Sequence, residues 1–229
     1  MATLYLIRHG QASFGKANYD ELSEKGWQQG RVLGRWLSGK VEPGAVFGGN
    51  LQRHRETVEA LAAGFTGTLP AMQAVMGLDE FDHNAVIQGY RPEWADRSVM
   101  TRELAAASQP LRAFQDAFVS AVERWASGEY DEDYRETWPA FRQRVANALE
   151  HILVFADGAD VLVMTSGGPI AVVLQSLLGL TDRRALGLNE VIANASVTRV
   201  LYSGSRRSLS VFNNYSHLEA EDPDLVTFR

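Results

Sequence analysis

The chain has 229 residues, of which 45% are hydrophobic and 22% are charged. This composition is typical of globular proteins and argues against disorder, collagen-like repeats and coiled coils. The formal charge of −6, with no compensating cluster of lysine and arginine, argues against a nucleic-acid partner. The absence of cysteine excludes disulfides, thiolate metal sites, cysteine nucleophiles and iron–sulfur clusters.

No targeting or membrane segment stands out in the sequence. The N-terminal apolar run is short and lacks the basic region of a signal peptide, and no stretch reaches the ~18 apolar residues of a membrane span. We therefore expect a cytoplasmic protein with no membrane partner. The length suits one α/β domain that carries an insertion.

The first two predicted elements are a buried strand and an amphipathic helix. Residues 4–7 are uniformly apolar and lead into Arg8-His9-Gly10, which is the pattern of a buried strand that ends in a loop. Ser23 is a favourable N-cap for a helix whose apolar residues recur at helical spacing as far as Ser38.

A second strand and helix repeat this order before the pattern changes. Residues 45–49 predict a strand and residues 51–63 the following helix, and a shorter apolar segment at 72–78 leads to Asp79 and Glu80. Residues from about 83 to 138 are mixed in polarity and contain prolines, so we expect a helical insertion there that caps the rest of the chain.

The remaining predicted elements return to the alternation of strand and helix. They are a helix over residues 139–155, a strand at 161–164, an apolar helix that ends at 178 with Pro169 in its first position, and a hairpin of strands 196–202 and 208–212.

Strands that alternate with helices predict a three-layer α/β/α sandwich with a mainly parallel sheet and one antiparallel hairpin near an edge. We expect residues 1–229 to form a single domain with a helical cap insertion at about 83–138. Ligands of such folds bind beyond the carboxyl ends of the strands. The polar residues that follow the predicted strands should therefore face one cleft.

That cleft would suit an anion. Arg8 and Arg53 would supply planar guanidinium groups for phosphate oxygens, and the glycine-rich helix start after Ser166 would add backbone N–H groups. A neutral His9 could attack phosphorus through one ring nitrogen if the other donates to a backbone carbonyl. A protonated Glu80 could give its proton to the leaving oxygen. These parts predict phosphoryl transfer through a phosphohistidine, without a metal or another cofactor.

Six short segments between residues 4 and 218 each resemble a motif of one known protein family. They are Leu6-Ile7-Arg8-His9-Gly10, Leu22-Ser23-Glu24-Lys25-Gly26-Trp27-Gln28-Gln29, Leu51-Gln52-Arg53-His54-Arg55-Glu56-Thr57, Leu78-Asp79-Glu80, Phe141-Arg142-Gln143-Arg144-Val145 and Asn213-Asn214-Tyr215-Ser216-His217-Leu218. In this order they resemble the motifs of the histidine phosphatase superfamily, which is also called phosphoglycerate mutase-like.

The resemblance implies a role for each main site residue. His9 would be the phosphorylated nucleophile, Arg8 and Arg53 would bind phosphate, and Glu80 would donate a proton. The family normally has a second histidine where this chain has Ser166, which is followed by Gly167. Ser166 and Gly167 would then bind phosphate through neutral donors, and the loss of one cationic donor would lower the rate by about 10²–10³-fold.

Three functions agree with this pattern. The first is a phosphatase for a small phosphorylated metabolite. The second is a protein that binds inorganic phosphate or a phosphoester with little turnover, which the Ser166 substitution motivates. The third is a phosphoglycerate mutase, although such mutases usually carry an arginine directly after the acid, where this chain has Phe81.

Several individual roles stay open at this point. Asp79 and Asp82 compete with Glu80 as the acid, and Ser166 could simply cap the helix that follows it. Further pocket candidates are Gln11, Ser13 and His83.

Other polar and aromatic residues have structural interpretations. His54 is expected to be an exposed polar residue, and His217 a structural residue near the end of the fold. The aromatic residues Trp94, Trp125 and Trp138 would form either a subunit contact, as in a homodimer, or a core within the insertion.

Overall fold

The computed structural model describes residues 1–13 and 20–228. The chain divides into two compact units, one formed by Met1–Glu80 with Arg144–Arg229 and the other by Phe81–Gln143. The first unit contains all six strands of the sheet, and the second consists of helices and turns. The helical insertion predicted at about residues 83–138 lies within the second unit.

A six-stranded sheet forms the centre of the first unit. Its strands are β1 (Ala2–Arg8), β2 (Ala45–Gly48), β3 (Met72–Ala74), β4 (Val161–Thr165), β5 (Val197–Ser203) and β6 (Arg206–Asn214). Their order is β3-β2-β4-β1-β5-β6, in which the first four strands are parallel and β5 and β6 are antiparallel. The predicted sheet and its edge hairpin are therefore confirmed.

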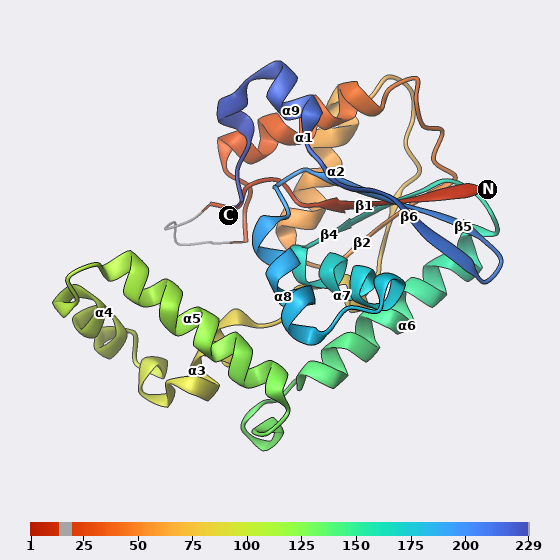
Figure 1. Ribbon diagram of the computed structural model, residues 1–229. Coiled ribbons are helices and arrows are strands. Elements are labelled where there is room, and N and C mark those ends of the chain that lie inside the picture. Colours follow the sequence, from red (N-terminus) through yellow and green to blue (C-terminus); the bar gives the residue numbers. More distant parts are fainter. Residues whose placement is uncertain (14–19, 229) are drawn as a thin grey trace. The chain divides into compact units, whose positions relative to one another are not determined.

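Helices cover both faces of this sheet (Figure 1). One face carries α1 (Glu24–Leu37), α2 (Gln52–Gly64) and α9 (Ser216–Glu221), and the other carries α7 (Gly167–Leu178), α8 (Asp182–Val191) and the part of α6 (Trp138–Ala156) that belongs to the first unit. Two short 3-10 turns, Met76–Leu78 and Pro223–Leu225, complete the unit. The three-layer α/β/α sandwich expected from the sequence is confirmed.

The alternation of side chains along β2 explains why both faces are covered. Val46 belongs to a buried cluster with Leu33 of α1 and Leu61 of α2. Its neighbour Phe47 points to the opposite face, where its ring meets Phe155 of α6 edge-on with centroids 5.5 Å apart. A strand that is apolar on both faces needs a helical layer on each side.

Local sequence signals set most ends of the helices and strands, and the structure corrects two of the predicted elements. Ser23 accepts a hydrogen bond from the Gly26 N–H and caps α1 as predicted. Pro169 occupies the third position of α7 and not the first, since the helix already begins at Gly167. The apolar segment at residues 72–78 divides into β3 and a 3-10 turn, because only three of its residues pair with β2.

The second unit contains short helices around aromatic side chains. Its elements are α3 (His83–Tyr90), a 3-10 turn Pro92–Ala95, α4 (Arg97–Ala106), α5 (Pro110–Ser127), a 3-10 turn Asp131–Asp133 and the start of α6. Trp125 packs against Trp138 and Phe141, with ring centroids 5.2 and 5.7 Å away. Trp94, Trp125 and Trp138 are all buried, so these tryptophans form core contacts inside the chain, which is one of the two alternatives predicted for them.

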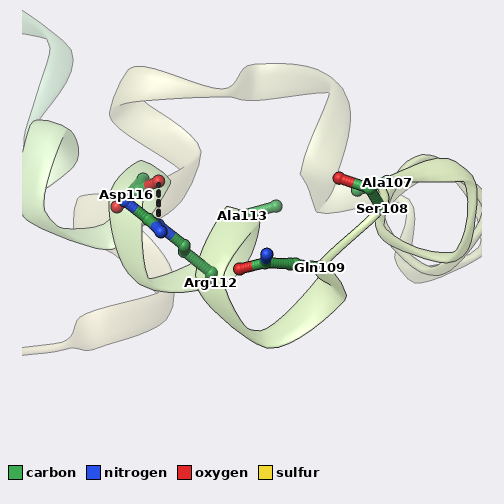
Figure 2. A pocket seen from close by; sticks show the side chains of 6 residues that line it. All are labelled: Ala107, Ser108, Gln109, Arg112, Ala113 and Asp116. Carbon is green, nitrogen blue, oxygen red and sulfur yellow. Dashed lines mark ion pairs between the residues drawn. The ribbon is translucent and has the colours of Figure 1, made fainter.

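A small hollow of the second unit is lined by residues 107–109, which precede α5, and by the first turns of α5 (Figure 2). Its lining includes Arg112, which is 3.9 Å from Asp116 and is therefore paired with a carboxylate. None of the predicted site residues contributes to it. Among the described residues, no helix is long and apolar enough to cross a membrane.

Candidate functional site

The predicted site residues of the first unit follow the carboxyl ends of its parallel strands. His9 follows β1, Arg53 lies in the first turn of α2 after β2, and Ser166 separates β4 from α7. The loops are joined by hydrogen bonds, one from the His9 N–H to the Thr165 carbonyl (2.9 Å) and one from Thr165 Oγ1 to the Leu78 carbonyl (2.6 Å). The fold therefore brings these segments to one edge of the sheet, as ligand sites of this class require.

The imidazole of His9 is held in a defined orientation. Its Nδ1 lies 2.7 Å from the Gly10 carbonyl oxygen, which can only accept a hydrogen bond, so Nδ1 carries the proton. Its Nε2 accepts a hydrogen bond from Arg53 Nε at 3.1 Å. Nε2 therefore presents a lone pair to a positive charge, which is the arrangement of a nitrogen nucleophile beside an anion site.

Burial and charge keep the His9 imidazole neutral. His9 is 7% exposed, and burial, together with the positive charges of Arg53 and Arg8, lowers the pKa of His9 well below its usual value. The backbone is fixed as well, because Asn194 Nδ2 donates to the His9 carbonyl at 3.2 Å. Because its pKa is lowered in this way, His9 Nε2 remains unprotonated at neutral pH.

Arg53 connects His9 to a carboxylate on another loop. Its Nη1 donates to Asp20 Oδ1 at 2.7 Å, and its own carbonyl accepts from Thr57 Oγ1 at 2.6 Å. Thr57 in turn accepts from the Gly10 N–H at 3.0 Å. The guanidinium group is thus positioned from α2 against the loop that follows β1.

Arg8 is placed differently from Arg53. Its Nη1 donates to the carbonyl oxygens of Ile192 and Phe228, the second at 3.0 Å. These contacts anchor the guanidinium group to two backbone segments, one directly after α8 and one at the C-terminal end of the chain. The positive charge still acts on the site, because it contributes to the lowered pKa of His9.

Glu80 lies at the start of α7. Its Oε2 accepts a hydrogen bond from the Gly168 N–H at 3.1 Å, and Arg144 Nη1 donates to the preceding carbonyl, that of Asp79, at 2.9 Å. Of the two competing carboxyl groups, Asp82 caps α3 in the second unit by accepting from the Asn84 and Ala85 N–H groups. Asp79 stays closer to the site and accepts from the Asn50 N–H at 2.6 Å.

Ser166 stands in the N-cap position of α7, but its side chain makes no capping hydrogen bond. Its Oγ instead lies 2.9 Å from Nε2 of His54. A Cβ on Gly167 would lie 2.0 Å from Asn189 Oδ1, so another residue there would displace the Asn189 side chain. Of the two alternatives for Ser166, capping of the helix by its side chain is therefore wrong, since its hydroxyl contacts His54.

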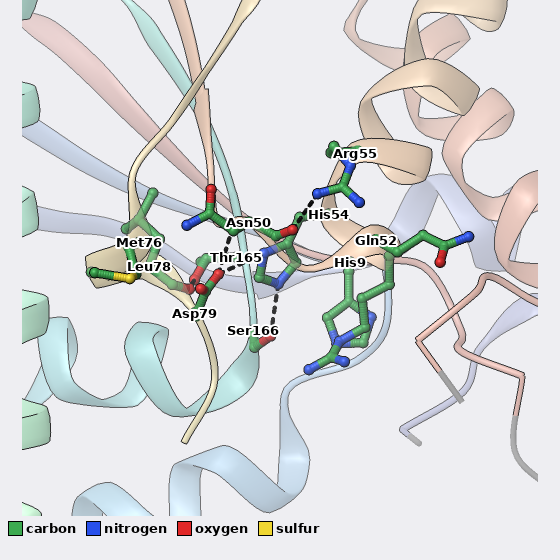
Figure 3. A network of polar contacts seen from close by, with 12 residues as sticks. His9, Asn50, Gln52, His54, Arg55, Met76, Leu78, Asp79, Thr165 and Ser166 are labelled. Carbon is green, nitrogen blue, oxygen red and sulfur yellow. Dashed lines mark hydrogen bonds and ion pairs between the residues drawn. The ribbon is translucent and has the colours of Figure 1, made fainter. Parts of the chain in front are cut away.

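His54 is the site residue that the sequence interpretation missed. It was expected to be exposed, yet it is fully buried, and its ring centroid lies 5.7 Å from that of His9 (Figure 3). Its place on α2 provides a signal, because Leu51, His54, Val58 and Leu61 recur at the spacing of one helix face. A histidine on the inward face of a helix should have been treated as buried.

The three secondary pocket candidates have other contacts. Gln11 Oε1 accepts from Ser23 Oγ at 2.8 Å, at the start of α1. Ser13 is 2% exposed, and its N–H donates to the Glu21 carbonyl. His83 belongs to the second unit, where its ring contacts those of Phe81 and Phe118. A pocket role for these residues stays a prediction.

The site thus combines a neutral imidazole, a buried guanidinium group, a carboxylate and a helix N-terminus, a set suited to a phosphoryl group. A family model described as the histidine phosphatase superfamily (branch 1) matches residues 4–215. The chain belongs to this superfamily. A search of curated proteins finds no significant match.

Several solved structures share the fold of this chain. Phosphoglycerate mutase from Bacillus anthracis str. Sterne gives a TM-score of 0.67 at 19% identity, over 95% of each chain. YhfR from Bacillus stearothermophilus gives 0.64 at 22% identity, over 95% of this chain and 100% of its own. A phosphoserine phosphatase from Entamoeba histolytica, solved with 3-phosphoglyceric acid, gives 0.64 at 18% identity, over 95% of this chain and 100% of its own. At these identities the likeness shows the fold alone.

Proposed function

We propose that this protein is a phosphomonoesterase that hydrolyses a small phosphorylated metabolite through a phosphohistidine at His9. One observation carries the proposal. The hydrogen bond between His9 Nδ1 and the Gly10 carbonyl leaves the lone pair on Nε2, where the buried Arg53 guanidinium lies 3.1 Å away. A buried cation beside a neutral nucleophile favours an anionic electrophile, and phosphate monoesters are of this kind.

In the first half-reaction His9 Nε2 attacks the phosphorus atom. A bond forms between Nε2 and phosphorus as the ester P–O bond breaks, and Glu80 gives its proton to the departing oxygen. Arg53 leaves Nε2 and binds the phosphoryl oxygens, and Arg8, Ser166 and the Gly167 N–H contribute further donors.

In the second half-reaction water attacks the phosphohistidine. Glu80, now a carboxylate, accepts the proton of the attacking water, and the bond between phosphorus and Nε2 breaks. Inorganic phosphate leaves and the lone pair returns to Nε2. His9 Nδ1 keeps its proton and its hydrogen bond to Gly10 in both steps, so no further proton carrier is needed.

The test is hydrolysis of a chromogenic phosphomonoester, followed by a screen of phosphorylated metabolites. We expect turnover and an acid-labile phosphoenzyme in the unmodified protein, and neither in His9→Ala. His151→Ala is the matched control, because His151 is exposed on α6. Turnover that survives His9→Ala would rule out the proposed nucleophile, and phosphate binding without turnover in the unmodified protein would favour a binding protein.

A further inference from the structure

The imidazole of His54 lies beside the proposed nucleophile but has no part in the mechanism above. His54 comes from α2, directly after Arg53, and its ring is tilted by 41° to that of His9 at a centroid distance of 5.7 Å. Figure 3 shows it between Asp79 on one side and Ser166 on the other. His54 therefore reaches the same strand ends as His9, from a different element.

The two ring nitrogens of His54 face different groups. Nε2 lies 2.9 Å from Ser166 Oγ, whereas Nδ1 faces the carboxylate of Asp79, 3.9 Å from its Oδ1. A carboxylate on the Nδ1 side favours the tautomer with the proton on Nδ1. Nε2 then accepts from the Ser166 hydroxyl, and the three side chains form a row that ends at α7.

The chain around His54 is shaped to hold this ring. Gly49 follows β2, and a Cβ on it would lie 2.3 Å from His54 Nδ1 and 2.4 Å from Asp79 Oδ1. Any side chain at position 49 would displace the imidazole or the carboxylate. The glycine therefore allows Asp79 and His54 to approach each other.

Packing alone does not explain a histidine at this position. Val58 and Leu61, which lie on the same face of α2, are apolar, and an apolar side chain at position 54 would avoid the burial of two polar nitrogens. Burial and the nearby charge of Arg53 lower the pKa of His54 to about 3, so the ring is neutral and its polarity is unfavourable in the unliganded fold. Buried polar groups of this kind cluster at functional sites.

We propose that His54 is a second imidazole of the phosphate site and acts with Ser166 as one unit that contacts the phosphoryl group bound at His9. This inference rests on the proposed function. Asp79 orients the ring through Nδ1. When a phosphoryl group binds, its negative charge lies beside Nε2, which takes up a proton from solvent, so that the Nε2–H and the Ser166 hydroxyl both donate to phosphoryl oxygens. The imidazole is thus supplied from α2, and the hydroxyl from the loop before α7.

The close approach of the two side chains leads to a specific expectation. Because Ser166 is fully buried and its Oγ lies 2.9 Å from His54 Nε2, the fold has room for one imidazole between the two positions. Ser166→His alone should therefore crowd the site. The exchanged double variant, His54→Ser with Ser166→His, keeps one imidazole and one hydroxyl in the same space.

The experiment compares four proteins, namely the unmodified chain, His54→Ala, His54→Gln and the exchanged double variant. Measured quantities are kcat and KM for a chromogenic phosphomonoester, and the Kd of inorganic phosphate by calorimetry. We expect kcat to fall about 10²-fold or more in His54→Ala and His54→Gln, and the exchanged variant to regain at least tenfold over His54→Ala. Thermal melting establishes that each protein is folded.

The outcomes separate this inference from the proposed function. Near-normal kcat in folded His54→Ala would overturn it. So would recovery in His54→Gln but not in the exchanged variant, because a glutamine can fill the space and bind Ser166 without an imidazole. If His54→Ala does not fold, the inference is tested by the kcat of His54→Gln against that of the exchanged variant. If the unmodified protein binds phosphate without hydrolysing esters, the proposed function fails. In that case the inference is tested by the Kd of inorganic phosphate, and a Kd that is the same in His54→Gln overturns the inference as well. An unmodified protein that neither hydrolyses esters nor binds phosphate overturns both.

Discussion

The Arg53 guanidinium donates to His9 Nε2 at 3.1 Å and so lies against the nitrogen that the proposed mechanism uses as nucleophile. The same guanidinium donates to Asp20 at 2.7 Å. Arg53 must therefore exchange its contact with Nε2 for contacts with the phosphoryl group before His9 can attack. One hydrogen bond therefore joins the proposed nucleophile to its proposed anion-binding group.

Arg53→Lys should lower kcat/KM for a phosphomonoester by about 10²–10³-fold, because a lysine ammonium cannot reproduce the planar donors that face His9 and a phosphate at once. Steady-state kinetics with a chromogenic ester measures the effect. Arg55→Lys is the matched control, since Arg55 is exposed and lies two residues further along the same helix. Equal kinetics for the two variants would exclude Arg53 from the site.

Glu80→Gln should lower kcat about 10²–10⁴-fold for esters with alkyl leaving groups, which need a proton, and much less for nitrophenyl esters. The glutamine oxygen can still accept from the Gly168 N–H, so the start of α7 should be unchanged. Asp79→Asn is measured beside it, because Asp79 is the competing carboxyl group near the site. If only Asp79→Asn shows the dependence on the leaving group, Asp79 is the acid.

Thr57→Val should destabilise the protein by about 1–3 kcal/mol, because it leaves the buried Gly10 N–H and the Arg53 carbonyl without the hydroxyl that joins them. In a chain of this size each kcal/mol corresponds to about 2–4 °C in Tm. Thr57→Ser keeps the hydroxyl and should retain most of the stability. A Thr57→Val protein with the same Tm as the unmodified chain would contradict this stabilising role of the Thr57 hydroxyl.

Acid should destabilise the fold through its buried histidines. The pKa of His217 is lowered to about 4, chiefly by burial, and that of His54 to about 3. The unfolded chain therefore binds more protons than the folded chain below pH 6.5, so stability falls as the pH drops from 6.5 towards these values. Each histidine contributes a loss of about 2 kcal/mol between pH 6.5 and 5.

Urea unfolding at several pH values measures this loss. His217→Gln should flatten the dependence of the unfolding free energy on pH, whatever its effect at pH 7, and leave the site untouched. His151→Gln, at an exposed position of α6, should leave the dependence unchanged. Parallel curves for His217→Gln and the unmodified chain would show that His217 does not titrate as expected.

The sequence by itself determined the layers of the fold, and it predicted the main residues of the candidate site. Continuous apolar runs define β1, β2 and β4, and Ser23 fixes the start of α1, because burial on two faces and helix capping are local properties of the chain. The motifs around His9 and Arg53 led to the superfamily, and the two side chains do meet. Pro169 shows the limit of such signals, since a proline fits more than one position in the first turn of a helix.

Only the tertiary structure decided what each polar group contacts. The tautomer of His9 depends on the Gly10 carbonyl and on Arg53, which is 44 residues away. The pairing of His54 with Ser166 joins residues 112 positions apart, and neither residue carries a local sign of it. Hydrogen bonds act over about 3 Å in space and are independent of distance along the chain. The sheet places the ends of its strands at one edge, and there His54, which was expected to be exposed, lies buried beside His9.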